Sequence, residues 1–152
     1  AVVGHDKFKN NVSESDAKAI IEVRVPAQVD DAAGKTEAST VLEKSDTVAI
    51  YGSNEFAAKA IINANGSFKE SKLGADKILA VGFDSGALQQ DAIRNGLFVG
   101  SVTQDPIQIG YQSVKLAIEA AQGKEVKDVD TGSKWYDAKN IDSDEIKPLL
   151  YQ

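Results

Sequence analysis

Three times along this chain, an apolar run that is typical of a β-strand leads into a short polar turn that opens a helix. The clearest case is Val81–Gly86, and the same order recurs at residues 51–55 and 101–106. Three polar side chains therefore follow the carboxyl ends of three successive strands: Asn54, Asp84 and Gln104. In an open parallel sheet these ends share one edge, which is the usual place for a ligand. We therefore expect the functional site at that edge.

Apolar periodicity extends this pattern over most of the chain. The sequence predicts strands at residues 21–25, 47–52, 78–83 and 97–102, and helices at residues 30–44, 55–65, 86–95 and 106–121. The nearly continuous apolar run at 78–83 is typical of a strand that is buried on both faces. Alternating strands and helices of this kind predict an α/β fold, a three-layer sandwich with a mostly parallel sheet and right-handed crossovers.

Short local signals mark the ends of these helices. The expected N-caps and C-terminal stops are Asp30 or Asp31, Asn54, Asp105, Gly66, Gly96 and Gly123. Proline at the first helical position strengthens the start at Asp105. For Asn65-Gly66 we expect the stop to be left-handed, as is common for glycine after a helix.

The helix that begins at Pro106 carries the most regular apolar spacing in the chain. Its apolar residues recur at intervals of three and four, which predicts one buried face: Ile107, Tyr111, Val114, Ile118 and Ala121. After Val126 the strand-helix pattern stops, so we divide the chain into residues 1–126 and a tail at residues 127–152. The apolar run at residues 1–4 begins abruptly, as an interior strand would, and we expect the chain to be truncated there.

Composition excludes several classes of function. The 152 residues fit one domain, and a net charge of −6 argues against nucleic acid, which needs clustered Lys and Arg to neutralise phosphates. The chain has no Cys and a single histidine, His5, so it offers neither a thiolate nucleophile nor a multi-histidine metal site. Its glycines form no nucleotide-binding fingerprint. We expect no catalytic residue, no metal site and no cofactor.

The three side chains at the strand ends have two explanations. Asn and Asp are common N-caps, and a Gln beside one is often merely exposed, so each residue taken singly is best explained by the fold. Taken together, Asn54, Asp84 and Gln104 bring one carboxylate and two amides to one edge. A carboxylate accepts hydrogen bonds, whereas an amide both donates and accepts them. The set therefore suits a neutral, polyhydroxylated ligand.

Several blocks of the sequence resemble a known family. Ala80-Val81-Gly82-Phe83-Asp84, residues 91–96, Thr103-Gln104-Asp105-Pro106 and Ile109-Gly110-Tyr111 follow one another in the order and at the spacing of that family, and residues 25–30 and 51–55 look like two more of its blocks. The family is the periplasmic sugar-binding proteins of ABC importers, of the ribose-binding type, whose fold is shared by the ligand domain of LacI-type regulators. The resemblance covers about residues 20–141.

This resemblance implies roles for particular residues. Asn54, Asp84 and Gln104 would hydrogen-bond the hydroxyls of a pentose or hexose. Val29 would pack on the apolar face of the sugar, where the ribose type has an aromatic residue. Ser15 stands where the family tends to carry a ligand-binding Arg. Both departures leave the identity of the sugar open.

The resemblance also implies a missing part and several partners. Members of the family clamp the sugar between two lobes that close about a hinge, and this chain resembles one lobe of such a type I binding protein, the C-terminal lobe. Residues 131–133 would then lie near the last hinge, and Trp135-Tyr136 and Asn140-Ile141 would pack on the missing N-terminal lobe. The implied partners are that lobe, the carbohydrate and the membrane permease of an importer. The implied location is periplasmic, or extracellular with a lipid anchor in a Gram-positive organism.

Two other interpretations remain. One is the ligand-binding domain of a LacI-type transcription regulator whose helix-turn-helix segment has been lost, which the sequence upstream of Ala1 would reveal. The other is a receiver-like signalling domain in which Asp6 and Asp84 hold Mg²⁺. Two observations argue against the receiver. No second acidic residue is adjacent to Asp6, and the strand that follows Asp84 does not end in a lysine. A phosphoryl adduct formed with acetyl phosphate would favour the receiver.

Overall fold

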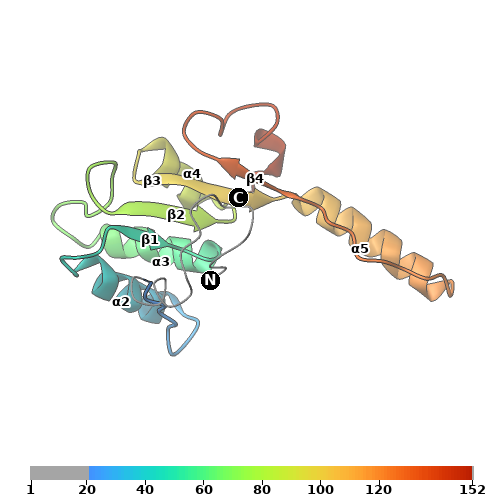
Figure 1. Cartoon of the computed structure of the whole chain (residues 1–152), viewed down its shortest axis with the longest axis horizontal. Helices are drawn as coiled ribbons and strands as arrows, with labels where there is room; N and C mark the ends of the chain where they lie inside the picture. The colour runs from blue at the N-terminus through green and yellow to red at the C-terminus, as the bar shows by residue number, and fades with distance from the viewer. Residues whose placement is uncertain (1–20, 152) are drawn as a thin grey trace.

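The structure, a computed structural model, describes residues 21–151 (Figure 1). Its elements in chain order are α2 (Asp31–Leu42), β1 (Ala49–Tyr51), α3 (Glu55–Asn65), β2 (Leu79–Phe83), α4 (Ala87–Arg94), β3 (Phe98–Gln104), α5 (Pro106–Ala121), β4 (Ser133–Tyr136) and the short 3-10 helix η1 (Lys147–Leu149). The α/β class that the sequence predicts is confirmed.

The four strands form one sheet in the order β1-β2-β3-β4. β1 and β2 are parallel with Ile50 opposite Ala80, and β2 and β3 are parallel with Gly82 opposite Ser101. β4 runs antiparallel to β3 at the sheet edge. The mostly parallel sheet is therefore as expected, and the carboxyl ends of β1, β2 and β3 lie along one edge of it.

The predicted N-caps are confirmed. A side-chain oxygen of Asp30, Asn54 and Asp105 accepts a hydrogen bond from the backbone N–H three residues later, over 2.8, 2.9 and 2.9 Å. Each bond satisfies one of the N–H groups that a helix start leaves without a partner. The three helices α2, α3 and α5 therefore begin where the sequence places them.

The C-terminal stops follow the prediction in two cases of three. Gly96 and Gly123 have φ of 70° and 75°, the left-handed conformation that glycine adopts without steric cost. The prediction for Gly66 is wrong, because its φ is −65° and its N–H still bonds to the carbonyl of Ile62 in helical fashion. The chain leaves α3 through a right-handed turn instead.

One face of the sheet forms the core. The connections through α3 and α4 join neighbouring parallel strands in succession, and right-handed crossovers of this kind place both helices on the same side. Ala80 and Gly82 face them and are buried, whereas Leu79 is 41% exposed and Phe83 is half-buried. The prediction that this strand is buried on both faces is therefore wrong within the part of the chain that the structure describes.

Residues 21–25 do not form the predicted strand. They have no regular structure, and Val23 and Val25 are exposed. A strand is stabilised by pairing with a neighbour, and none of the four described strands pairs with this segment. The alternation of Val23 and Val25 with charged residues is thus insufficient by itself to place a strand here.

α5 departs most from expectation. It extends away from the sheet, and the chain that follows it returns alongside (Figure 1). None of its residues is buried, and Tyr111 and Val114 are each 62% exposed. The predicted helix is confirmed, but its predicted buried face is wrong in this structure because α5 does not lie on the sheet. Within residues 21–151, no helix is long and apolar enough to span a membrane.

The tail packs on the same domain within this chain. β4 pairs with β3, with Trp135 opposite Val102, and residues after it return to the core of the domain. Tyr136 is completely buried and Ile141 is 1% exposed. The packing of the tail on an N-terminal lobe stays a prediction.

Candidate functional site

The three polar residues that the sequence singles out lie at the ends of adjacent strands. The N–H of Gly52 donates to the carbonyl of Val81 over 2.9 Å, and the N–H of Asp84 donates to the carbonyl of Val102 over 2.8 Å. These bonds continue the sheet ladder past the ends of β1 and β2. Asn54, Asp84 and Gln104 therefore share the edge that the topology predicts.

Asn54 and Asp84 both hydrogen-bond to the first turn of α3. The N–H of Glu55 donates to Oδ2 of Asp84 over 2.9 Å, while Oδ1 of Asn54 caps the same helix at Ala57. Both side chains thus stabilise the start of α3. This is the fold-based explanation of each residue. Among the described residues 21–151, the second carboxylate oxygen of Asp84 and the amide nitrogen of Asn54 have no hydrogen-bonding partner.

Gln104 and the two remaining predicted residues differ from this pair. Gln104 is the last residue of β3 and is exposed. Val29 is 84% exposed and lies directly before the N-cap of α2, where it makes no buried contact. Ser15 lies outside the described residues. The structure thus gathers Asn54, Asp84 and Gln104 at one edge and does not bring Val29 into the core beside them.

Tyr151 is a residue of this edge that sequence reasoning missed. Its hydroxyl oxygen lies 3.5 Å from the backbone nitrogen of Ser85, and its carbonyl accepts from Nε2 of Gln90 over 2.9 Å. Burial raises the pKa of its phenol, and the neighbouring carboxylates of Asp84 and Glu55 raise that pKa further. No local pattern marks Tyr151, because only the path of the tail brings it here.

Tyr136 is a second residue that sequence reasoning missed. Its hydroxyl donates to the backbone oxygen of Asp84 over 2.8 Å from the far side of β3. Burial raises the pKa of Tyr136 to about 12, so the hydroxyl remains a protonated donor at neutral pH. The aromatic pair Trp135-Tyr136 is the one sequence feature that could have pointed to this residue. That Tyr136 contacts Asp84 depends on the register of β4 against β3, which the sequence does not reveal.

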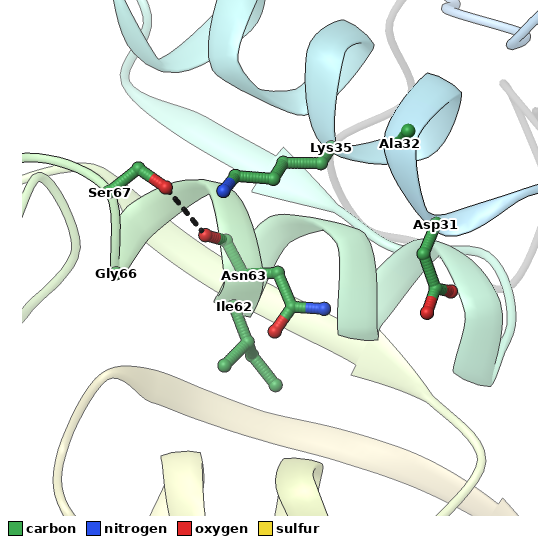
Figure 2. A pocket seen from close by; sticks show the side chains of 7 residues that line it. All are labelled: Asp31, Ala32, Lys35, Ile62, Asn63, Gly66 and Ser67. Atoms are coloured by element: carbon green, nitrogen blue, oxygen red, sulfur yellow. Dashed lines mark hydrogen bonds between the residues drawn. The ribbon is translucent and has the colours of Figure 1, made fainter.

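A shallow groove lies elsewhere, between α2 and the C-terminal end of α3 (Figure 2). It is lined by Asp31, Ala32, Lys35, Ile62, Asn63, Gly66 and Ser67. The hydroxyl of Ser67 donates to the carbonyl of Asn63 over 3.2 Å, and Lys35 extends over the groove. Since Asn54 begins α3 and Asn63 lies near its end, this groove is remote from the strand ends. Its open shape does not enclose a ligand.

Comparisons with solved structures find close likenesses. A protein described as an ABC transporter, LacI family transcriptional regulator from Brachyspira murdochii shares 41% identity over 86% of this chain, with a TM-score of 0.76. An ABC transporter solute-binding protein from Agrobacterium vitis with bound D-fucose shares 27% identity over 88% of the chain, with a TM-score of 0.75. A carbohydrate transporter solute-binding protein from Agrobacterium radiobacter in complex with D-arabinose shares 26% identity over 77%, with a TM-score of 0.66.

This chain spans 43%, 47% and 40% of those three chains, less than half in each case. Comparison with curated proteins gave no match. The family model described as a periplasmic binding protein domain matches residues 6–125, which is most of the chain and includes all three strand ends. This chain belongs to the family of periplasmic binding protein domains.

Proposed function

We propose that this chain is the sugar-binding C-terminal lobe of a two-lobed solute-binding protein that serves an ABC importer. The observation that carries the proposal is the meeting of Asn54, Asp84 and Gln104 at the carboxyl ends of three adjacent strands. Membership of the family supports it, and so do the monosaccharides named for two similar proteins, D-fucose and D-arabinose. The ligand is accordingly a pentose or hexose.

The chemistry of this edge fits sugar hydroxyls. Within residues 21–151, Oδ1 of Asp84 accepts no hydrogen bond. Nδ2 of Asn54 and the side-chain amide of Gln104 have no protein partner there either. One carboxylate oxygen accepts from a hydroxyl, and the amides supply the complementary donors and a further acceptor. Binding of this kind involves no covalent step, so the protein acts as a carrier rather than as an enzyme.

The rest of the site belongs to a second lobe. The chain covers less than half of the relatives' length, and α5 carries an apolar face that is exposed. We assign residues 1–126 to the C-terminal lobe, with α5 resting on the N-terminal lobe, and residues 127–152 to the hinge crossover and tail. Sugar bound between the lobes stabilises their closed arrangement, and the importer permease binds the closed form. The protein then works in the periplasm or on the cell surface.

The alternative is the ligand-binding domain of a LacI-type transcription regulator. One observation favours it, because the protein from Brachyspira murdochii, at 41% identity, carries that description beside the transporter one. The two functions use the same lobe architecture and differ in what precedes it. A secretion signal upstream supports transport, whereas a helix-turn-helix segment upstream supports regulation.

The test is to isolate the protein from its source and to measure its mass and sugar affinity. We expect a species of about twice this length that binds an aldose with a Kd on the order of 1 μM, and an Asp84→Ala variant that binds at least about tenfold more weakly. Asp76→Ala, an exposed change near the opposite end of β2, is the control. A species of the length of this chain that already binds the sugar with micromolar affinity would contradict the two-lobed proposal.

A further inference from the structure

Asp84 has a backbone conformation that its side chain disfavours. Among residues 21–151 it is the single residue other than glycine with a positive φ, at 75°. The left-handed region crowds the Cβ atom, although Asp and Asn tolerate it better than other residues. Such a conformation persists where the surroundings hold it, and it is often found at functional sites.

Hydrogen bonds hold both peptide groups of Asp84. Its N–H donates to the carbonyl of Val102 over 2.8 Å. Its carbonyl oxygen accepts from the hydroxyl of Tyr136 over 2.8 Å, from the hydroxyl of Ser101 over 2.9 Å and from Nε2 of Gln89 over 3.3 Å. Three donors on one carbonyl fix the plane of the peptide that follows Asp84, and hence the direction of the side chain before it.

We propose that Tyr136 is a positioning residue for the ligand carboxylate of Asp84. Its hydroxyl reaches across from β4 and fixes the left-handed turn in which Oδ2 of Asp84 meets the N–H of Glu55. The inference rests on the proposed function where it concerns sugar, and on the geometry alone where it concerns the turn. It gives the tail a role at the strand ends, although the tail follows all three predicted ligand residues in the sequence.

Tyr136 is better suited to this task than the other two donors. Its ring is completely buried, so the hydroxyl is held by packing as well as by its hydrogen bond. Gln89 divides its amide between the carbonyls of Asp84 and Phe83, and the bond to Phe83 is shorter, at 2.8 Å. Ser101 is likewise completely buried, and its Oγ also accepts from Nε2 of Gln89 over 3.4 Å. Tyr136 makes the shortest of the three bonds to the Asp84 carbonyl, and it is the donor that comes from β4.

The test is hydrogen–deuterium exchange of the Glu55 amide, followed by NMR in the full 152-residue chain. In the wild type we expect this amide to be protected, because it donates to Oδ2 of Asp84. Asp84→Ala removes the acceptor and identifies the part of the protection that depends on Asp84, while the Ala57 amide, which donates to Oδ1 of Asn54, reports on the same helix start independently. Relative to Ala57, Tyr136→Phe should lose most of that part, whereas the matched control Tyr111→Phe, on the exposed α5, should retain it.

Each outcome separates positioning from simple support of the fold. If Tyr136→Phe only lowers the unfolding midpoint and leaves the Glu55 protection unchanged relative to Ala57, the proposal is wrong. If this variant does not fold, Ser101→Ala removes another donor from the same carbonyl but leaves the bond from Tyr136. The proposal then predicts that most of the Glu55 protection remains, and loss of most of it would assign the positioning to Ser101 and overturn the proposal.

A second readout is a titration with D-arabinose, for which Tyr136→Phe should weaken the response of the strand-end amides about tenfold relative to Tyr111→Phe. An equal response in the two variants would refute the role toward sugar. Should the wild-type chain fail to respond to D-arabinose or D-fucose, the proposed function is in error, while the exchange of the Glu55 amide still decides whether Tyr136 positions Asp84.

Discussion

The backbone N–H of Glu55 donates to Oδ2 of Asp84 over 2.9 Å, which ties the end of β2 to the start of the helix that follows β1. Oδ1 of Asn54 caps that same helix at Ala57. The residues proposed to bind sugar are thus also residues that stabilise α3. Separating these two roles requires substitutions that preserve one and remove the other.

Asn54 allows such a separation. Asn54→Ser keeps a good N-cap but removes the amide donor, so we expect the free energy of unfolding to change by less than about 0.5 kcal/mol, whereas Asn54→Ala should lower it by about 1 kcal/mol. In sugar titrations both variants should respond more weakly than the wild type. Urea denaturation checks the first expectation. If Asn54→Ser retains the full sugar response, Asn54 is a cap and nothing more.

Gly100 provides a test of the β3–β4 pairing. A Cβ atom there would collide with the ring of Trp135 and approach the carbonyl oxygen of Tyr136 to 2.6 Å. Gly100→Ala should therefore lower the free energy of unfolding by about 1–3 kcal/mol and alter the fluorescence of Trp135. The matched control is Gly110→Ala in α5, where nothing lies within 4 Å and where alanine should be neutral or stabilising. Equal effects of the two changes would contradict the pairing.

The exposed face of α5 is tested by comparing a surface and a core change. Val114 is 62% exposed, so Val114→Lys should change the free energy of unfolding of this chain by less than about 0.5 kcal/mol. Ile141 is buried in the core, and Ile141→Ala should cost about 2–5 kcal/mol. Chemical denaturation of both variants measures the difference. A large cost for Val114→Lys would mean that α5 packs on the body of the domain in solution.

The raised pKa of Tyr136 predicts a loss of stability at high pH. Burial raises that pKa from 10.0 to about 12, which favours the neutral phenol in the fold. The corresponding stabilisation is complete below the unfolded pKa near 10 and is lost as the pH rises through about 12; it amounts to about 3 kcal/mol. Tyr136→Phe should lack this part of the pH dependence, as denaturation at a series of pH values would show. If the free energy of unfolding of Tyr136→Phe falls with pH between 10 and 12 as steeply as that of the wild type, this prediction is wrong.

Much of the sheet edge is predictable because its signals are local. The N-caps at Asp30, Asn54 and Asp105 depend on residues three positions apart, and the apolar runs before Asn54 and Asp105 locate the ends of β1 and β3. Parallel topology then brings the ends of β1, β2 and β3 together. For these reasons the sequence alone locates Asn54, Asp84 and Gln104 along one edge.

The sequence predictions fail where a structure depends on contacts with residues far away in the chain. The pairing of β4 with β3 is a long-range contact, and without it neither the burial of Tyr136 nor its bond to Asp84 is foreseeable. Apolar spacing identifies the face of α5 that can pack on another apolar surface, but it does not say whether that surface lies within this chain. The alternation at residues 21–25 is typical of a strand, yet a strand forms only beside another.

The most direct test of the sugar-binding edge is an NMR titration of this chain with D-fucose and D-arabinose. In the proposed two-lobed arrangement this chain supplies only part of the hydrogen bonds to the sugar, so we predict weak binding, with a Kd on the order of 1 mM or above, and amide shifts confined to residues 54–55, 84–86 and 104–105. Asp84→Ala should abolish these shifts. Shifts centred instead on the groove at Lys35 and Asn63, or no shift at the strand ends with saturating sugar, would contradict the proposed site.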